Sequence, residues 1–100
     1  MKNFNSLLLK EKFLLVEFYA DWCEPCKMLD VILEEVRNHM GEKIFIQKID
    51  VDVSKEISEF YHVMSVPVLM LFKNGKLVWR INGFLMANEL IKTIEKNFEL

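Results

Sequence analysis

The two cysteines of this chain, Cys23 and Cys26, lie where a predicted strand meets a predicted helix. The strand is the apolar run Phe13–Tyr19, and the helix is Cys23–Met40, in which apolar residues recur at helical spacing. A helix N-terminus stabilises a thiolate through unpaired N–H groups and the positive end of its dipole. Pro25 suits this position because its missing N–H is no loss in the first turn. The spacing therefore favours a redox-active dithiol over a structural staple.

The rest of the pattern predicts helices and strands in the order α-β-α-β-α-β-β-α. Asn74-Gly75 is typical of a two-residue turn between antiparallel strands. The other expected elements are helices at Phe4–Lys12, Lys55–Tyr61 and Ala87–Phe98, and strands at Lys43–Asp50, Val68–Lys73 and Lys76–Asn82. We therefore expect an α/β fold of one domain, residues 1–100, with a central four-stranded mixed sheet flanked by helices.

Charge and hydropathy exclude several kinds of partner. A formal net charge of −2 and a pI near 5.7 give no basic surface for a nucleic acid. The uncharged run Tyr61–Phe72 is too short to cross a bilayer, so no membrane is expected. The N-terminal apolar residues are split by the charged segment Lys10–Lys12, which argues against a signal peptide. These features predict a cytoplasmic protein, in a reducing compartment where a cysteine pair is catalytic rather than structural.

The segment Trp22–Lys27, WCEPCK, resembles the W-C-x-P-C-K motif of the thioredoxin family. The similarity extends in order through Lys48–Asp52 (KIDVD), Ser65–Gly75 (SVPVLMLFKNG) and Gly83. The resemblance implies a thioredoxin-like fold and a thiol–disulfide oxidoreductase that mainly reduces protein disulfides. Members of this family usually have a strand before the first helix. Because only Met1–Asn3 precede the predicted helix here, we expect that strand to be absent. The strand Lys43–Asp50, which would otherwise pair with it, should then be a sheet edge.

In this chemistry the Cys23 thiolate attacks a substrate disulfide, and Cys26 then resolves the mixed disulfide. We expect Cys23 to be partly exposed and Cys26 to be more buried. One alternative is a pair of small buried apolar residues. Another is a metal site, but structural zinc takes about four N or S ligands, and only His39 and His62 could add to the cysteines. We expect no metal in the single chain; a cluster shared by two chains through their cysteine pairs remains an alternative.

Two acidic residues near the cysteines are candidates for function. Glu17 interrupts the apolar strand, and a buried carboxylate needs a partner, for which Lys48 on the neighbouring strand is the candidate. The resemblance implies that Glu17 transfers the proton of Cys26, as a buried aspartate does in the family; the alternative is a solvent-facing glutamate. Glu24 stands where the family most often has glycine. Its charge would raise the pKa of the Cys23 thiol, unless it is a solvated surface residue.

The resemblance also implies a substrate-binding surface around the cysteines. Family members hold a cis peptide bond before the proline that corresponds to Pro67, which leaves the backbone of Val66 open to an extended substrate. The residues expected to form an apolar rim around Cys23 are Trp22, Val66, Pro67, Gly83 and Phe84. Gly83 would let a substrate backbone approach closely. Phe84 is bulkier than the usual residue, and the alternative is that it belongs to the core.

The expected partners follow from the resemblance as well. They are protein disulfides as substrates and a thioredoxin reductase, a flavoprotein that supplies electrons from NADPH. No Gly-rich phosphate loop is present, so the chain is expected to bind no cofactor itself and to act as a monomeric electron carrier in cell redox homeostasis. The competing hypothesis is a non-catalytic adaptor with the same fold. Cys23, Cys26 and Pro67 would not be needed in such a binding module.

Overall fold

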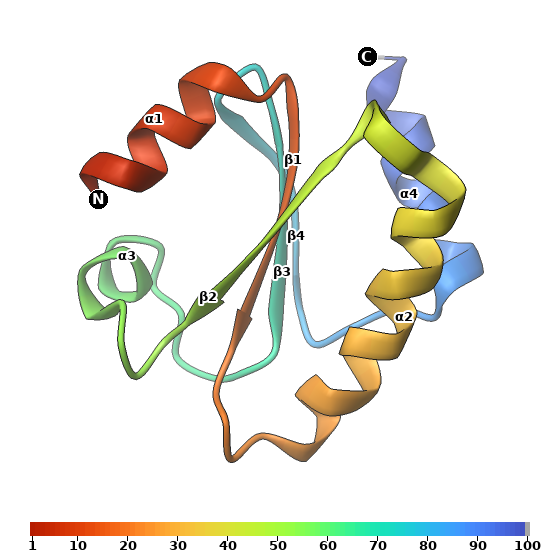
Figure 1. Cartoon of the computed structure of the whole chain (residues 1–100). Coiled ribbons are helices and arrows are strands. Elements are labelled where there is room, and N and C mark those ends of the chain that lie inside the picture. Colours follow the sequence, from red (N-terminus) through yellow and green to blue (C-terminus); the bar gives the residue numbers. More distant parts are fainter. Residues whose placement is uncertain (100) are drawn as a thin grey trace.

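A four-stranded mixed sheet forms the centre of the protein in the computed structural model, which describes residues 1–99 (Figure 1). The elements in chain order are α1 (Lys2–Lys10), β1 (Phe13–Tyr19), α2 (Glu24–Met40), the 3-10 turn η1 (Gly41–Lys43), β2 (Phe45–Asp50), α3 (Lys55–Phe60), β3 (Val68–Lys73), β4 (Lys76–Asn82) and α4 (Ala87–Phe98). The strand order is β2-β1-β3-β4; β1 is parallel to β2 and antiparallel to β3, and β3 is antiparallel to β4. The predicted α/β fold is confirmed.

Strand β2 is an edge of this sheet, as predicted for the Lys43–Asp50 segment. Within residues 1–99, β1 is the strand that pairs with it, and no other strand lies beyond it. The residues before β1 form helix α1 from Lys2 onward rather than an additional strand. The sheet described here therefore has the four strands expected from the sequence.

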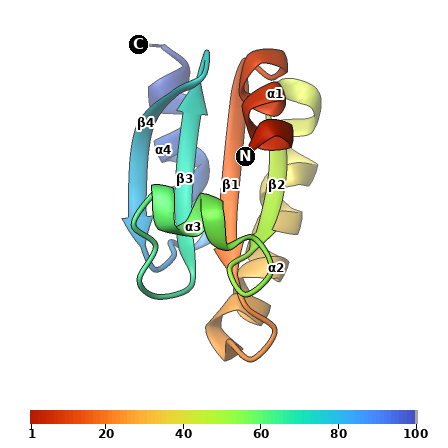
Figure 2. The same cartoon turned by 90° about the vertical axis from the view of Figure 1, so that its left-hand side faces the viewer.

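Two helices cover each face of the sheet. Helices α1 and α3 lie on one side, and helices α2 and α4 lie on the other (Figure 1, Figure 2). Successive side chains of a strand point to opposite faces. Accordingly Leu14, Val16 and Phe18 pack on the α1–α3 side, whereas Leu15 packs with α2 and α4. The same alternation places Glu17 on the face that α2 covers.

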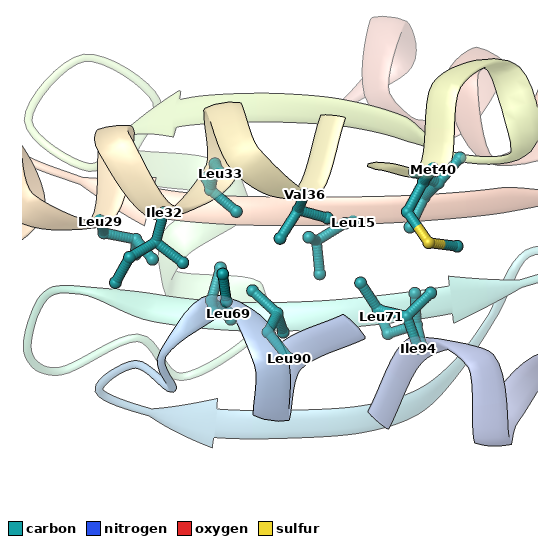
Figure 3. Close-up of a cluster of buried hydrophobic side chains, with 12 residues drawn as sticks. Leu15, Leu29, Ile32, Leu33, Val36, Met40, Leu69, Leu71, Leu90 and Ile94 are labelled. Atoms are coloured by element: carbon teal, nitrogen blue, oxygen red, sulfur yellow. The ribbon is translucent and has the colours of Figure 1, made fainter. Parts of the chain in front are cut away.

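The larger apolar core lies between the sheet and helices α2 and α4 (Figure 3). The sheet contributes Leu15, Leu69 and Leu71 to it. The buried residues of the two helices in this core include Leu29, Ile32, Leu33, Val36 and Met40 of α2 and Leu90 and Ile94 of α4. The predicted apolar stripe of α2 is thus buried along its length. This packing fixes the helix whose N-terminus carries the cysteine pair.

Two helices end earlier than predicted. The first helix spans Lys2–Lys10 rather than Phe4–Lys12, because the backbone is already extended at Glu11 and leads directly into β1. The third helix, predicted at Lys55–Tyr61, ends one residue earlier, with Tyr61 as its C-cap. The last residue of such a helix depends on where the backbone turns toward the next element. The apolar periodicity of the sequence does not contain this information.

The second strand begins at Phe45 and not at Lys43. Helix α2 ends at Met40, and its C-cap Gly41 has a φ of +58°, which turns the chain. The 3-10 turn η1 then takes up Lys43, the residue that was predicted to start the strand. The hairpin between β3 and β4 is as predicted. Asn74 and Gly75 have φ values of +51° and +81°, as a two-residue turn of this kind requires.

Replacing Phe4 by alanine should destabilise the protein through loss of the contact that holds α1 on the sheet. Phe4 is 5% exposed, and its ring packs edge-to-face on Tyr61 and Phe72 at centroid distances of 5.9 and 5.7 Å. We expect Phe4→Ala to lower the free energy of unfolding by about 3 kcal/mol. Urea denaturation of the disulfide-intact protein measures this change.

Leu9→Ala is the matched control, because Leu9 belongs to the same helix but is 91% exposed. Its effect should stay within about 0.5 kcal/mol. Equal effects of the two substitutions would show that Phe4 does not anchor α1.

Candidate active site

The cysteine pair is closed as a disulfide at the start of α2. The Cα atoms of Cys23 and Cys26 lie 5.3 Å apart. Cys23 is the N-cap of the helix, and its Sγ accepts a hydrogen bond from the backbone N–H of Cys26 at 3.3 Å. Pro25 occupies the first turn. A thiolate formed at Cys23 would be stabilised by this N–H group and by the helix dipole.

Cys23 is as buried as Cys26, and both are 3% exposed. The expectation that Cys23 is partly exposed is therefore wrong for the disulfide form. The residues that pack around the pair come from the end of β1, the residue that follows it and two distant loops: Tyr19, Ala20, Val51 and Val66. Their combined coverage leaves little of either sulfur accessible to solvent.

Trp22 lies beside the pair on the surface and is 70% exposed. Its indole Nε1 donates a hydrogen bond to Oδ2 of Asp52 at 3.0 Å. This bond joins the loop before α2 to the loop after β2. A hollow of about 90 Å³ opens next to Trp22, between the side chains of Val63, Met64 and Val66. Met64 is 91% exposed at its rim.

Glu24 is at the surface, and its carboxylate makes an ion pair with the ammonium of Lys27 at 3.0 Å. Its side chain is 81% exposed. This geometry agrees with the surface alternative, because solvent and a neighbouring cation both screen the charge. Its influence on the Cys23 thiol stays a prediction.

The segment before β3 carries the predicted cis peptide bond, between Val66 and Pro67. Val66 packs against the cysteine pair, and Pro67 is buried. The N–H of Gly83 donates to the carbonyl of Pro67 at 2.8 Å, which places Gly83 next to this segment. Gly83 has φ +132°, a conformation that favours glycine, whereas an added Cβ would meet no atom within 4 Å. The backbone conformation, and not lack of space, thus explains the glycine.

Phe84 is half-buried and packs against the core of α2 and α4. It does not belong to the group of side chains packed on the cysteines. The alternative that Phe84 is a core residue therefore describes its position better than a place in the rim.

Arg80 of β4 supports the loop that leads to Pro67, and sequence reasoning missed it. Its Nη1 donates to the carbonyl of Tyr61, and its Nη2 donates to the carbonyl of His62 at 3.1 Å. His62 has φ +54°, which is uncommon for a residue with a side chain. The only signal in the sequence is a cation within an edge strand, which alone indicates no particular partner.

Glu17 is fully buried, so the solvent-facing alternative is wrong. Neither carboxyl oxygen has a hydrogen-bond partner among residues 1–99. Burial, followed by the negative charge of Asp30, raises the pKa of Glu17 from its ordinary value of 4.5 to about 7, against the opposing effect of Lys48. In the sheet Glu17 lies opposite Lys48 on one side and Leu69 on the other. The carboxyl group can therefore gain or lose a proton near neutral pH.

Lys48 is not the direct ion-pair partner of Glu17 that the sequence predicted. Its ammonium instead contacts Oδ1 of Asp30 at 2.9 Å and lies 4.3 Å from the centroid of the Tyr19 ring. Strand pairing places Lys48 opposite Glu17, but the packing of α2 against the sheet brings Asp30 within reach of the same lysine. Sequence reasoning missed Asp30, although its position four residues after Cys26 places both on one face of α2.

A second opening, of about 180 Å³, lies between the Asp30–Lys48 ion pair and the cysteines. Its lining includes Cys23, Cys26, Tyr19, Asp30 and Lys48. Within residues 1–99, no group of three or more histidine, cysteine, aspartate or glutamate side chains is arranged to hold a metal ion. None of the helices in that range is long and apolar enough to cross a membrane.

A cysteine pair at a helix N-terminus, beside a cis-proline loop and a buried acid, defines a dithiol redox protein. A comparison with protein families matches residues 1–96 to the Thioredoxin family. Thioredoxin Y, chloroplastic, of Oryza sativa subsp. japonica is 43% identical over 99 residues, which cover 98% of this chain and 59% of the rice protein. The thioredoxin of Bacillus subtilis is 41% identical over 87 residues, which cover 87% of this chain and 84% of that protein. The chain therefore belongs to the thioredoxin family and is a thiol–disulfide oxidoreductase of the protein-disulfide reductase type.

Solved structures agree with this assignment. A mutant thioredoxin from Halobacterium salinarum superimposes with a TM-score of 0.90 at 32% identity, covering 100% of this chain and 87% of that one. Mitochondrial thioredoxin 3 from Saccharomyces cerevisiae, in its oxidised form, gives a TM-score of 0.86 at 32% identity, covering 95% of this chain and 88% of that one.

The buried acid predicts a specific dependence of stability on pH. Because the pKa of Glu17 is higher in the folded protein, the folded state binds more protons than the unfolded state between about pH 4.5 and pH 7. Stability therefore falls as the pH rises through this window. The replacement Glu17→Gln removes this loss, so its stability advantage over the unmodified protein should grow by roughly 3 kcal/mol from pH 4 to pH 8.

Urea denaturation of both disulfide-intact proteins across this range measures the difference, in which the contributions of other groups cancel. Glu24→Gln is the control for an exposed glutamate and should show no comparable trend. A difference between Glu17→Gln and the unmodified protein that does not change with pH would contradict a raised pKa.

Proposed function

We propose that Cys23 is the attacking cysteine and Cys26 the resolving cysteine of this oxidoreductase. The observation that supports it best is the hydrogen bond from the Cys26 N–H to the Cys23 sulfur at the N-cap of α2. The Cys23 thiolate attacks one sulfur of a substrate disulfide and releases the other as a thiolate. Cys26 then attacks the Cys23 sulfur, which releases the second substrate thiol. Two electrons pass to the substrate, and the cysteine pair closes.

In this proposal Glu17 takes up the proton that Cys26 loses as it attacks. A general base works best when its pKa is near the working pH, and the pKa of about 7 at Glu17 meets this condition. Glu17 lies on the sheet face covered by α2, the helix that carries Cys26. Lys48 acts on Glu17 by its charge rather than by a direct bond.

Substrate binding is assigned to the surface next to the cysteines. Trp22, Val66 and Met64 supply apolar contacts around the hollow beside the pair. Val66, Pro67 and Gly83 supply backbone that an extended polypeptide could approach, and Phe84 supports this surface from the core. Glu24 and Pro25 are the residues between the cysteines that tune their reactivity.

The electron donor we propose is a thioredoxin reductase, an NADPH-dependent flavoprotein. The protein would then act as a monomeric electron carrier between this enzyme and protein disulfides. We place it in the reducing cytoplasm, where the cysteine pair can be kept as a dithiol. Localisation of the full-length protein tests the compartment, and a chloroplast signal, as the name of the rice relative would suggest, would contradict this placement.

Reduction of insulin tests the function directly. The protein, with a thioredoxin reductase and NADPH, should consume NADPH and cause the insulin B chain to precipitate. A parallel reaction with dithiothreitol separates failure of the reductase partner from failure of the cysteine pair. No acceleration of insulin reduction in either reaction would favour the adaptor hypothesis.

The roles of the two cysteines can be distinguished by replacing each with serine. Cys23→Ser should abolish disulfide reduction, because no thiolate begins the reaction. Cys26→Ser should accumulate a covalent mixed disulfide with the substrate, since attack proceeds but resolution cannot. Non-reducing electrophoresis with mass spectrometry detects the trapped species, and trapping by Cys23→Ser alone would reverse the assignment.

A further inference from the structure

Asp30 is an acidic residue of α2 that the reaction described above does not use. Its carboxylate makes the 2.9 Å ion pair with Lys48. We propose that Asp30 is a positioning residue of the reaction. It holds the Lys48 ammonium away from Glu17 and so keeps the proton affinity of Glu17 high enough to take the proton of Cys26. The inference rests on the proposed role of Glu17.

The geometry gives Lys48 two partners, and neither is Glu17. Asp30 binds its ammonium from α2, while the ring of Tyr19 lies 4.3 Å from it at the end of β1. In the register of the sheet, however, Lys48 is the residue of β2 directly opposite Glu17. The carboxylate of Asp30 and that of Glu17 therefore compete for one lysine, and Asp30 makes the bond.

The consequence for Glu17 follows from charge and burial. A buried carboxyl group without a direct cation favours its neutral form, and a nearby negative charge favours it further. Asp30 provides both effects: its ion pair keeps the Lys48 ammonium from binding Glu17, and its own negative charge lies near Glu17. Without Asp30, Lys48 could turn to Glu17 and stabilise the carboxylate, which would then hold a proton only at lower pH.

Other charged groups around the site do not replace this role. The opening beside the cysteines also contains Asp21 and Lys27, but Lys27 pairs with Glu24 at the surface. Strand β3 presents an apolar residue, Leu69, opposite Glu17. Asp30 and Lys48 are thus the charged pair whose arrangement can change the proton affinity of Glu17.

Stopped-flow reduction of dithiobis(nitrobenzoate) by the reduced full-length protein tests the inference. Attack by Cys23 releases the first nitrothiobenzoate, and resolution by Cys26 releases the second and closes the disulfide. The rate of the second release is measured between pH 5 and pH 9. With Asp30→Asn, its midpoint should move to lower pH by about 1 unit, because an opposite charge brought within about 4–6 Å of a carboxyl group lowers its pKa by roughly 1–3 units, and Lys48 would be free to approach Glu17. The conservative Asp30→Glu keeps the negative charge, so its midpoint should stay closer to that of the unmodified protein.

Glu34→Gln is the matched control, because Glu34 lies one turn further along α2 in a surface ion pair with Arg37 at 2.8 Å. It should leave the midpoint unchanged. An unchanged midpoint with Asp30→Asn, or an equal shift with Glu34→Gln, would overturn the inference. Asp30 is half-exposed, so its replacement should not prevent folding, which a single cooperative urea transition of the variant would verify.

The variant Glu17→Gln separates this inference from the function on which it rests. Loss of the pH-dependent step in Glu17→Gln, together with no effect of Asp30→Asn, would reject the role of Asp30 alone. A profile of Glu17→Gln identical to that of the unmodified protein would reject Glu17 as proton acceptor, and the inference about Asp30 with it. Normal trapping by Cys26→Ser would in either case leave the cysteine roles intact.

Discussion

A carboxyl group buried in the central strand is the constraint on which the proposed chemistry of this site depends. Glu17 is fully buried, and no hydrogen bond from residues 1–99 reaches its oxygens. Such burial is costly for a charged group and is the main reason that the pKa of Glu17 rises to about 7. The folded protein is therefore less stable at neutral pH than it would be with an uncharged residue at this position, which lies under the helix that carries the cysteines.

The fold supplies the other half of the site. Packing of α2 against the sheet, through the apolar stripe that ends at Met40, fixes the N-terminus of that helix next to the end of β1. At this junction Cys23 is the N-cap, and its sulfur accepts a hydrogen bond from the N–H of Cys26. The two sulfurs therefore differ in environment, although both cysteines are equally buried. The loop before β3, held by Arg80, brings Val66 against them. The cysteine pair and the buried carboxyl group are therefore positioned by different elements, the start of α2 and strand β1.

The sequence was sufficient for the fold and for the residues of the cysteine motif, because strand and helix periodicity and the C-x-x-C spacing are local signals. It also indicated that Glu17 was unusual, since a charged residue inside a continuous apolar strand has few explanations. It could not show that Lys48 would bind Asp30, because that contact depends on how α2 packs across β2. It also could not show that Cys23 is covered, since Val51 and Val66 reach it from distant loops. Where the chemistry depends on contacts between elements, the structure was needed.

The central claim, that Glu17 is a buried acid ionising near neutral pH, can be measured without reference to activity. Carbon-detected NMR of the oxidised protein, labelled with ¹³C in glutamate, follows the side-chain carboxyl carbon of Glu17 as the pH changes. Assignment by comparison with Glu17→Gln identifies its signal. The titration midpoint of this carboxyl group should lie near pH 7. A midpoint at the ordinary glutamate value of 4.5 would contradict it.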